Sequence, residues 1–114
     1  MSDTMYPVVG PDIARRRKEL AKDSLQAFHA FSQKVFADGA IPAKTKQLIA
    51  VAVAHVTQCP YCIDSHAKQA VQHGATDEEI MEAIWVAAEM RAGGAYAHSA
   101  LALQAIKDAR AESS

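Results

Sequence analysis

The stretch "KTKQLIAVAVAHVTQCPYCIDSH", residues 44–66, joins an apolar segment directly to both cysteines of the chain. Residues 48–56 are apolar at nearly every position, which predicts a helix that is buried on almost all sides. Pro60 suits the first position of a following helix, because its missing N–H would have no partner there. That start places Cys59 at the N-cap and Cys62 in the first turn. The stretch therefore predicts two consecutive helices with a CxxC motif at their junction.

The rest of the chain also predicts an all-α fold. The sequence is rich in alanine and lacks the alternation of polar and apolar residues that is typical of strands. Thr76 and Glu79 form a capping-box pattern at one helix start, and Gly93 and Gly94 separate two further helical segments. We expect about five to six helices, of which five can be placed at about residues 12–37, 44–56, 60–73, 77–90 and 95–112.

Length, charge and composition limit the setting of the protein. We expect one domain over residues 1–114, with an irregular N-terminal arm at 1–11 and a core at 40–92. A net charge of -1 provides no strong field for nucleic acid or an anionic membrane, so we expect neither partner. The N-terminus lacks a signal-peptide pattern, and no apolar run is long enough to span a bilayer. We therefore expect a cytoplasmic protein.

The two cysteines are placed for thiol chemistry. Free backbone N–H groups and the helix dipole at a helix start favour a thiolate. Two thiols separated by two residues can also close a disulfide, so that one attacks and the other resolves the product. His66 follows Cys62 by one helical turn on the same face, where it can act as the base. Cys59, Cys62 and His66 are therefore the predicted catalytic residues.

Other interpretations of the motif remain open at this point. A CxxC with nearby histidines can bind zinc, and His55 is the nearest candidate for a further ligand. Buried cysteines also serve as small apolar residues in a core. A thioredoxin-type domain would need βαβ units, which this sequence does not indicate. A redox centre that uses no cofactor and no metal is the interpretation that we carry forward.

The segment "KTKQLIAVAVAHVTQCPYCIDSHAKQAVQHGATDEEIMEAIWVAA" resembles the carboxymuconolactone decarboxylase family, in its AhpD-like alkylhydroperoxidase branch. The resemblance covers about residues 40–92. It implies subunits that assemble as trimers or hexamers and an antioxidant peroxidase or disulfide reductase activity. The substrate would be a hydroperoxide or a protein disulfide, and an external thiol would be the reductant. By this resemblance Cys62 attacks, Cys59 resolves and His66 handles the proton.

The sequence departs from the AhpD-like pattern at two positions. Gln47 stands twelve residues before the first cysteine, where the pattern has a glutamate that belongs to the proton relay. Tyr61 replaces a histidine inside the motif. Because glutamine cannot take up a proton at neutral pH, we consider Glu89 and His98 as substitutes in a relay with Gln47.

Two further classes of function compete with the peroxidase. Decarboxylase members of the family lack the CxxC pair, so the pair argues against a carboxymuconolactone decarboxylase-like enzyme. A non-enzymatic module that senses oxidants or binds a metal would use the same dithiol without turnover. A small chain has little room to bury a helix that is apolar on all sides, which independently favours a homo-oligomer.

Overall fold

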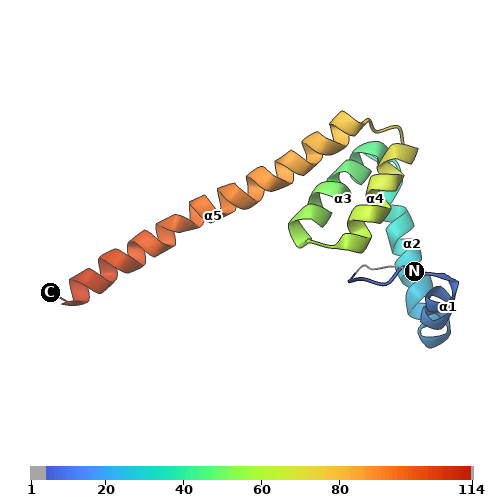
Figure 1. Ribbon diagram of the computed structural model, residues 1–114, viewed down its shortest axis with the longest axis horizontal. Helices are drawn as coiled ribbons and strands as arrows, with labels where there is room; N and C mark the ends of the chain where they lie inside the picture. Colours follow the sequence, from blue (N-terminus) through green and yellow to red (C-terminus); the bar gives the residue numbers. More distant parts are fainter. Residues whose placement is uncertain (1–4, 114) are drawn as a thin grey trace. The chain divides into compact units, whose positions relative to one another are not determined.

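The computed structural model describes residues 5–113, and its regular structure in this range is entirely helical. Figure 1 shows the order of the elements. They are α1 (Pro11–Leu20), α2 (Lys22–Phe36), α3 (Ala43–Thr57), α4 (Pro60–Gln72) and α5 (Asp77–Ser113). The predicted all-α fold, with a CxxC pair at a helix start, is confirmed.

The chain divides into two compact units, Met1–Ala37 and Asp38–Ser114. The prediction of a single domain over residues 1–114 stays a prediction. Residues 5–10 of the expected N-terminal arm are irregular, and its first four residues lie outside the described part of the chain.

The first unit contains two helices where the sequence predicts one over residues 12–37. Ala21 interrupts the predicted helix with φ -151° and ψ 53°, and α1 contacts α2 on the other side of this break. The single-helix prediction is therefore wrong. No proline or glycine marks the break, and alanine is the best helix former, so the sequence carries no local signal for it.

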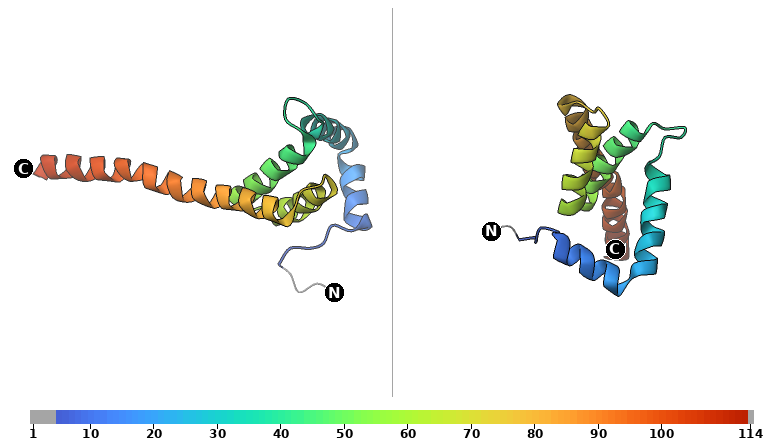
Figure 2. Two further views of the ribbon diagram at one scale, coloured as in Figure 1. Left: turned by 90° about the horizontal axis from the view of Figure 1, so that it is seen from above. Right: turned by 90° about the vertical axis from the view of Figure 1, so that its right-hand side faces the viewer.

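The second unit is built around α3, which contacts both α4 and α5. Figure 2 shows α3 and α4 from two further directions, lying side by side as an antiparallel pair. At the start of α3, Oδ1 of Asp38 accepts a hydrogen bond of 2.7 Å from the backbone N–H of Ala43. This bond satisfies one of the free N–H groups at the helix start and fixes where α3 begins.

The core of the second unit is small and lies where the three helices meet. Its buried members are Val51 of α3, Ala70 of α4 and Ala75 of the following turn. Leu48, Ile80 and Ile84 pack against them. Alanine dominates the α4 side, so the backbones can approach closely and hold α4 firmly on α3.

The turn between α4 and α5 carries two clear local signals. Gly74 has φ 88°, a left-handed conformation that glycine adopts without steric penalty. Thr76 and Glu79 then form the predicted capping box, with bonds of 2.9 and 3.1 Å between the side chain of each and the backbone N–H of the other. Lys44 of α3 forms an ion pair of 2.9 Å with Glu79, which ties the start of α5 to α3.

The last helix is longer than the sequence predicts. Residues 77–90 and 95–112 were expected to form separate helices, but α5 runs without a break through Gly93 and Gly94. Neither glycine has a positive φ, and no proline lies near them. Alanine-rich flanks stabilise the helix enough to offset the cost of about 1 kcal/mol per glycine. The predicted helix break is therefore wrong.

Residues 95–113 of α5 are exposed along their whole length in the isolated chain. They include large apolar side chains, namely Tyr96, Leu101, Leu103 and Ile106. Within the described residues, no helix combines the length and hydropathy needed to cross a membrane.

Candidate functional site

The candidate site begins at the turn that joins α3 to α4. Gln58 ends α3 in the left-handed conformation, with φ 58° and ψ 47°. The backbone N–H of Cys59 then donates to the carbonyl of Ala54 over 3.1 Å, which closes the last turn of α3. Because this turn contains only Gln58 and Cys59 between the two helices, the first cysteine is fixed at the start of α4.

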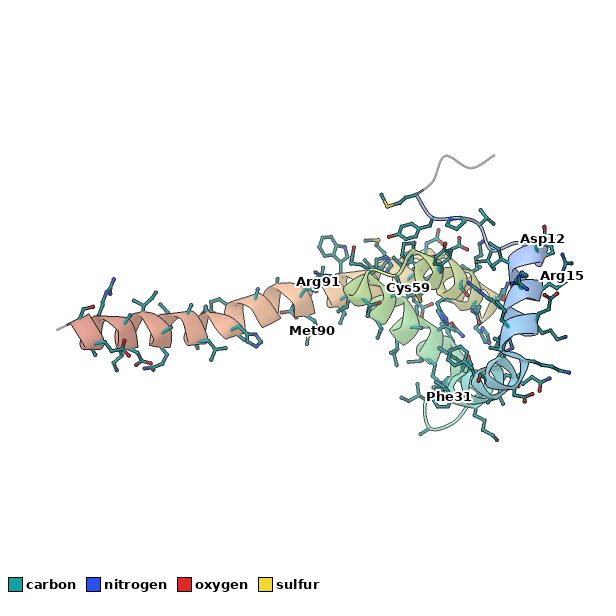
Figure 3. All side chains as sticks on the ribbon, turned by 90° about the horizontal axis from the view of Figure 1, so that it is seen from below. Asp12, Arg15, Phe31, Cys59, Met90 and Arg91 are labelled. Atoms are coloured by element: carbon teal, nitrogen blue, oxygen red, sulfur yellow. A yellow bond between two sulfur atoms is a disulfide. The ribbon has the colours of Figure 1, made fainter. Side chains whose placement is uncertain are left out.

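An arginine from α5 holds the same turn from outside the motif. Nη1 of Arg91 donates a hydrogen bond of 2.8 Å to the carbonyl of Val56. Figure 3 shows Cys59 at the start of α4, and Met90 and Arg91 on α5. A cation at the carboxyl end of a helix stabilises the free carbonyl groups there. Arg91 is thus a structural residue of the site that the sequence analysis missed.

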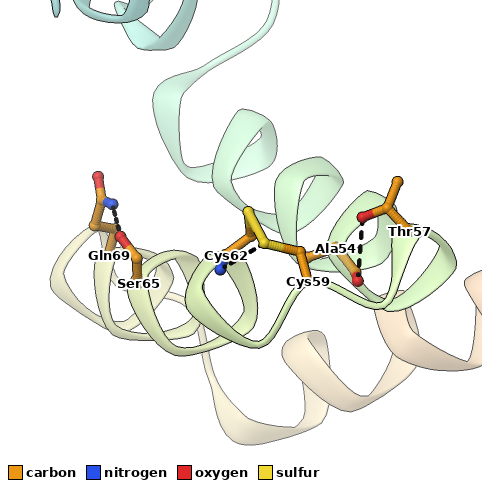
Figure 4. The surroundings of a disulfide bond; sticks show 6 residues. All are labelled: Ala54, Thr57, Cys59, Cys62, Ser65 and Gln69. Atoms are coloured by element: carbon orange, nitrogen blue, oxygen red, sulfur yellow. Dashed lines mark hydrogen bonds between the residues drawn. A yellow bond between two sulfur atoms is a disulfide. The ribbon is translucent and has the colours of Figure 1, made fainter. Parts of the chain in front are cut away.

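The two cysteines form a disulfide across the first turn of α4, with a Cα–Cα distance of 5.3 Å. Cys59 is the N-cap residue, and its Sγ accepts a hydrogen bond of 3.2 Å from the backbone N–H of Cys62 (Figure 4). Both residues are partly exposed. When the pair is reduced, the same N–H and the helix dipole stabilise a thiolate at Cys59.

The predicted base lies one turn further along α4. Cys62 and His66 are four residues apart, and so they share a face of the helix. Nδ1 of His66 lies 2.7 Å from Oε1 of Gln47, which projects from α3 and is 1% exposed. Burial lowers the pKa of His66 below the ordinary value of 6.5, because the surroundings disfavour the charged form. The imidazole is therefore neutral at pH 7 and can accept a proton.

A second glutamine completes the polar cluster between α3 and α4. Nε2 of Gln47 donates to Oε1 of Gln69 over 3.3 Å, and Nε2 of Gln69 donates to Oγ of Ser65 over 2.9 Å. Figure 4 shows the Ser65–Gln69 pair on the helix that carries the disulfide. Gln69 and Ser65 were not among the residues predicted for the site. Their spacing of four residues on one helix was visible, but the bond to Gln47 depends on how α3 packs on α4.

Glu89 and His98, which were considered as substitutes in a proton relay, contact neighbouring residues of their own helix, α5. A Cβ atom added to Gly93 would lie 3.5 Å from Oε1 of Glu89, so this carboxylate lies along its own helix. Nδ1 of His98 lies 2.7 Å from the carbonyl oxygen of Gly94. The structure thus brings Gln47, but neither Glu89 nor His98, into hydrogen-bond contact with His66 within the described interactions. Their relay role stays a prediction.

His55, which the sequence offers as a further metal ligand, has a structural partner. Its Nδ1 donates to the carbonyl of Val51 over 2.7 Å within α3. Among residues 5–113, no group of three or more histidine, cysteine, aspartate or glutamate side chains is placed to hold a metal ion.

Comparison with known proteins agrees with this architecture. A Paracoccus denitrificans protein called uncharacterized protein 4 in cox locus is 67% identical over 82 residues, which are 72% of this chain and 74% of that relative. A solved structure from Methanobacterium thermoautotrophicum has a TM-score of 0.69 at 32% identity, covering 73% of this chain and 93% of that chain.

A third comparison carries the name of a family. A Thermotoga maritima structure has a TM-score of 0.53 at 36% identity, covering 56% of this chain and 66% of that chain. It is described as a carboxymuconolactone decarboxylase family protein with a suggested involvement in an antioxidative response. The sequence pattern of that family also matches residues 22–105 of the present chain, a range that contains α3, α4 and the CxxC pair. With most of its length matched and the helical fold shared, the chain belongs to the carboxymuconolactone decarboxylase family.

Proposed function

We propose that the protein is a thiol-dependent oxidoreductase that reduces hydroperoxides by cycling Cys59 and Cys62 between dithiol and disulfide. The observation that carries the proposal is the cysteine pair across the first turn of α4, one turn before a neutral His66. A family relative with a suggested involvement in an antioxidative response supports this direction.

In the oxidative half of the cycle, His66 accepts the proton of Cys62, and the thiolate attacks one oxygen of the hydroperoxide. The O–O bond breaks, Cys62 becomes a sulfenic acid, and the second oxygen leaves as an alkoxide that takes up a proton to form an alcohol. The Cys59 thiolate then attacks the sulfenic sulfur. This forms the disulfide and releases water after the hydroxyl group is protonated.

In the reductive half, an external dithiol returns two electrons to the protein. Its thiolate attacks the sulfur of Cys62, and Cys59 leaves as the thiolate, because the N–H of Cys62 and the helix start stabilise that charge. The second thiol of the reductant then attacks the mixed disulfide. This step frees Cys62 and leaves the reductant as a disulfide. A protein disulfide can replace the hydroperoxide as the electron acceptor in the same cycle, which is the disulfide oxidoreductase form of the proposal.

The test is steady-state consumption of cumene hydroperoxide in the presence of dithiothreitol. We expect wild type to turn over many times per chain, Cys62→Ser to consume no peroxide at this site, and Cys59→Ser to turn over more slowly than wild type, because dithiothreitol must then attack the Cys62 sulfenic acid directly. His66→Gln should slow turnover by about 10²-fold, a usual contribution of a general base. His73→Gln removes an exposed histidine at the end of the same helix and should keep the wild-type rate.

Two outcomes would overturn the enzyme proposal. If wild type consumes one equivalent and stops with its disulfide intact in the presence of dithiothreitol, the pair responds to an oxidant once without turnover, as a sensor would. If the cysteine variants consume peroxide as fast as wild type, the pair is not the reacting group.

We further propose that the protein acts in the cytoplasm as a homo-oligomer, either a trimer or a hexamer. The exposed apolar side chains of α5 support an assembly, because a surface with several such residues is usually covered by a partner. Light scattering after size-exclusion chromatography should give three or six times the mass of one chain. A mass equal to one chain at micromolar concentration would contradict the assembly.

A further inference from the structure

We infer that Gln69 is a positioning residue, which acts through Gln47 to keep the hydrogen of the neutral His66 ring on Nδ1 and the lone pair on Nε2. The inference rests on the proposed function only in making Nε2 the nitrogen that accepts the thiol proton. The three side chains of Gln69, Gln47 and His66 are linked by hydrogen bonds across the α3–α4 pair.

The side-chain amide of Gln47 is buried between α3 and α4. An amide side chain has one acceptor end and one donor end, and Gln47 is 1% exposed, so both ends need protein partners. Its Nε2 donates to Oε1 of Gln69, which leaves Oε1 directed at Nδ1 of His66. An oxygen at 2.7 Å requires a donor, and so Nδ1 carries the hydrogen. The reversed amide would place an NH₂ group against that N–H.

Gln69 decides which way the amide of Gln47 is turned. In the observed arrangement its Oε1 accepts from Nε2 of Gln47, and its own Nε2 donates to Oγ of Ser65 at 2.9 Å. An acceptor at this place favours the orientation of Gln47 that is observed, whereas an apolar side chain would favour neither orientation. With a glutamate at position 47 the carboxylate would accept from Nδ1–H without help. With glutamine at position 47, Oε1 of Gln69 on α4 favours the amide orientation in which Oε1 of Gln47 faces His66.

The test reads the tautomer directly, independently of turnover. Two-bond ¹⁵N–¹H correlation spectra of ¹⁵N-histidine-labelled oxidised protein at pH 8 distinguish Nδ1–H from Nε2–H, and loss of signals in His66→Gln assigns the ring. We expect wild type to show the Nδ1–H form. Gln69→Leu should shift the tautomer ratio toward Nε2–H by about fivefold, the effect of one neutral hydrogen bond.

Two matched variants separate positioning from a loss of packing. Gln69→Glu keeps an oxygen that can accept from Gln47, so it should restore the Nδ1–H form. Gln72→Leu makes the same change at an exposed position three residues further along α4, and it should leave the His66 signals unchanged.

Each result decides one of the two proposals. Wild type in the Nε2–H form, or a Gln69→Leu ratio equal to that of wild type, overturns the role of Gln69 even if the enzyme consumes peroxide. The expected tautomers in a protein that does not turn over overturn the peroxidase and leave the positioning role intact. Where turnover occurs, Gln69→Leu should lower the rate about two- to fivefold, and Gln69→Glu should recover it.

Discussion

Oε1 of Gln47 lies 2.7 Å from Nδ1 of His66, although the two residues belong to different helices and are nineteen positions apart. This contact places a neutral acceptor at the position where a glutamate is expected from the resemblance to the AhpD-like branch. A carboxylate beside the ring would favour imidazolium, whereas the amide allows burial to lower the pKa of His66. A glutamine at this position therefore favours a neutral ring at pH 7 and keeps the hydrogen bond that orients the ring.

Gln47→Glu should raise the pKa of His66 above 6.5, because the new carboxylate stabilises the charged ring more than burial opposes it. Titration of the His66 ring by NMR measures the shift directly. Gln72→Glu adds the same charge at an exposed position of α4 and should leave the pKa of His66 nearly unchanged. A value in Gln47→Glu that stays below 6.5 would show that the carboxylate does not govern the ring.

The pH dependence of stability should contain a contribution from His66. Its pKa in the folded state lies below the unfolded value, so the unfolded chain takes up the proton first as the pH falls. The free energy of unfolding of wild type should therefore decrease as the pH falls through 6.5. Urea denaturation at pH 7.5 and 5.5 should show a smaller decrease for His66→Gln than for wild type and for His73→Gln. Equal decreases in all three proteins would contradict this contribution.

Substitution of glycine by alanine should change stability in opposite directions at Gly74, in the turn before α5, and at Gly94, within α5. Gly74→Ala should destabilise the fold by about 1–2 kcal/mol, because an L-residue is strained at φ 88°. Gly94→Ala should stabilise α5 by about 0.5–1 kcal/mol, since this glycine is helical and an added Cβ has open space around it. Chemical denaturation measures both. Destabilisation by Gly94→Ala would instead reveal that another subunit packs closely on this position.

The capping box of α5 should contribute measurably to stability. Thr76→Ala removes the acceptor of the Glu79 N–H and should lower the free energy of unfolding by about 1 kcal/mol. The pKa of Glu79 is lowered mainly by the backbone hydrogen bond from Thr76, so its stabilising effect should be lost as the pH falls below 4.5. Thr45→Ala at an exposed position in the first turn of α3 serves as the control, because the Thr45 side chain makes no cap bond there. Equal stability of Thr76→Ala and wild type would contradict the cap.

Local signals in the sequence were sufficient to predict the centre of the fold. Pro60 and the apolar run before it predict α3, the turn and α4, and Thr76 predicts the start of α5. The break at Ala21 and the continuity through Gly93 were not predictable in this way. Both depend on small differences in helix stability that no capping or breaking residue marks.

The candidate site divides in the same way. The spacing along α4 predicts that Cys62 and His66 share a face, whereas the bond between Gln69 and Gln47 needs the register of α4 on α3. That register depends on the close packing of Val51 of α3 and Ala70 of α4 in the buried core. No sequence motif marks this packing.

The disulfide closes a ring between residues only three positions apart, so both sulfurs belong to a single helical turn. Loop closure this short constrains the unfolded chain less than a long-range bridge does. The pair is therefore poorly suited to fastening distant segments and well suited to storing two electrons. The helices around the pair can keep their positions while the two cysteines change between disulfide and dithiol.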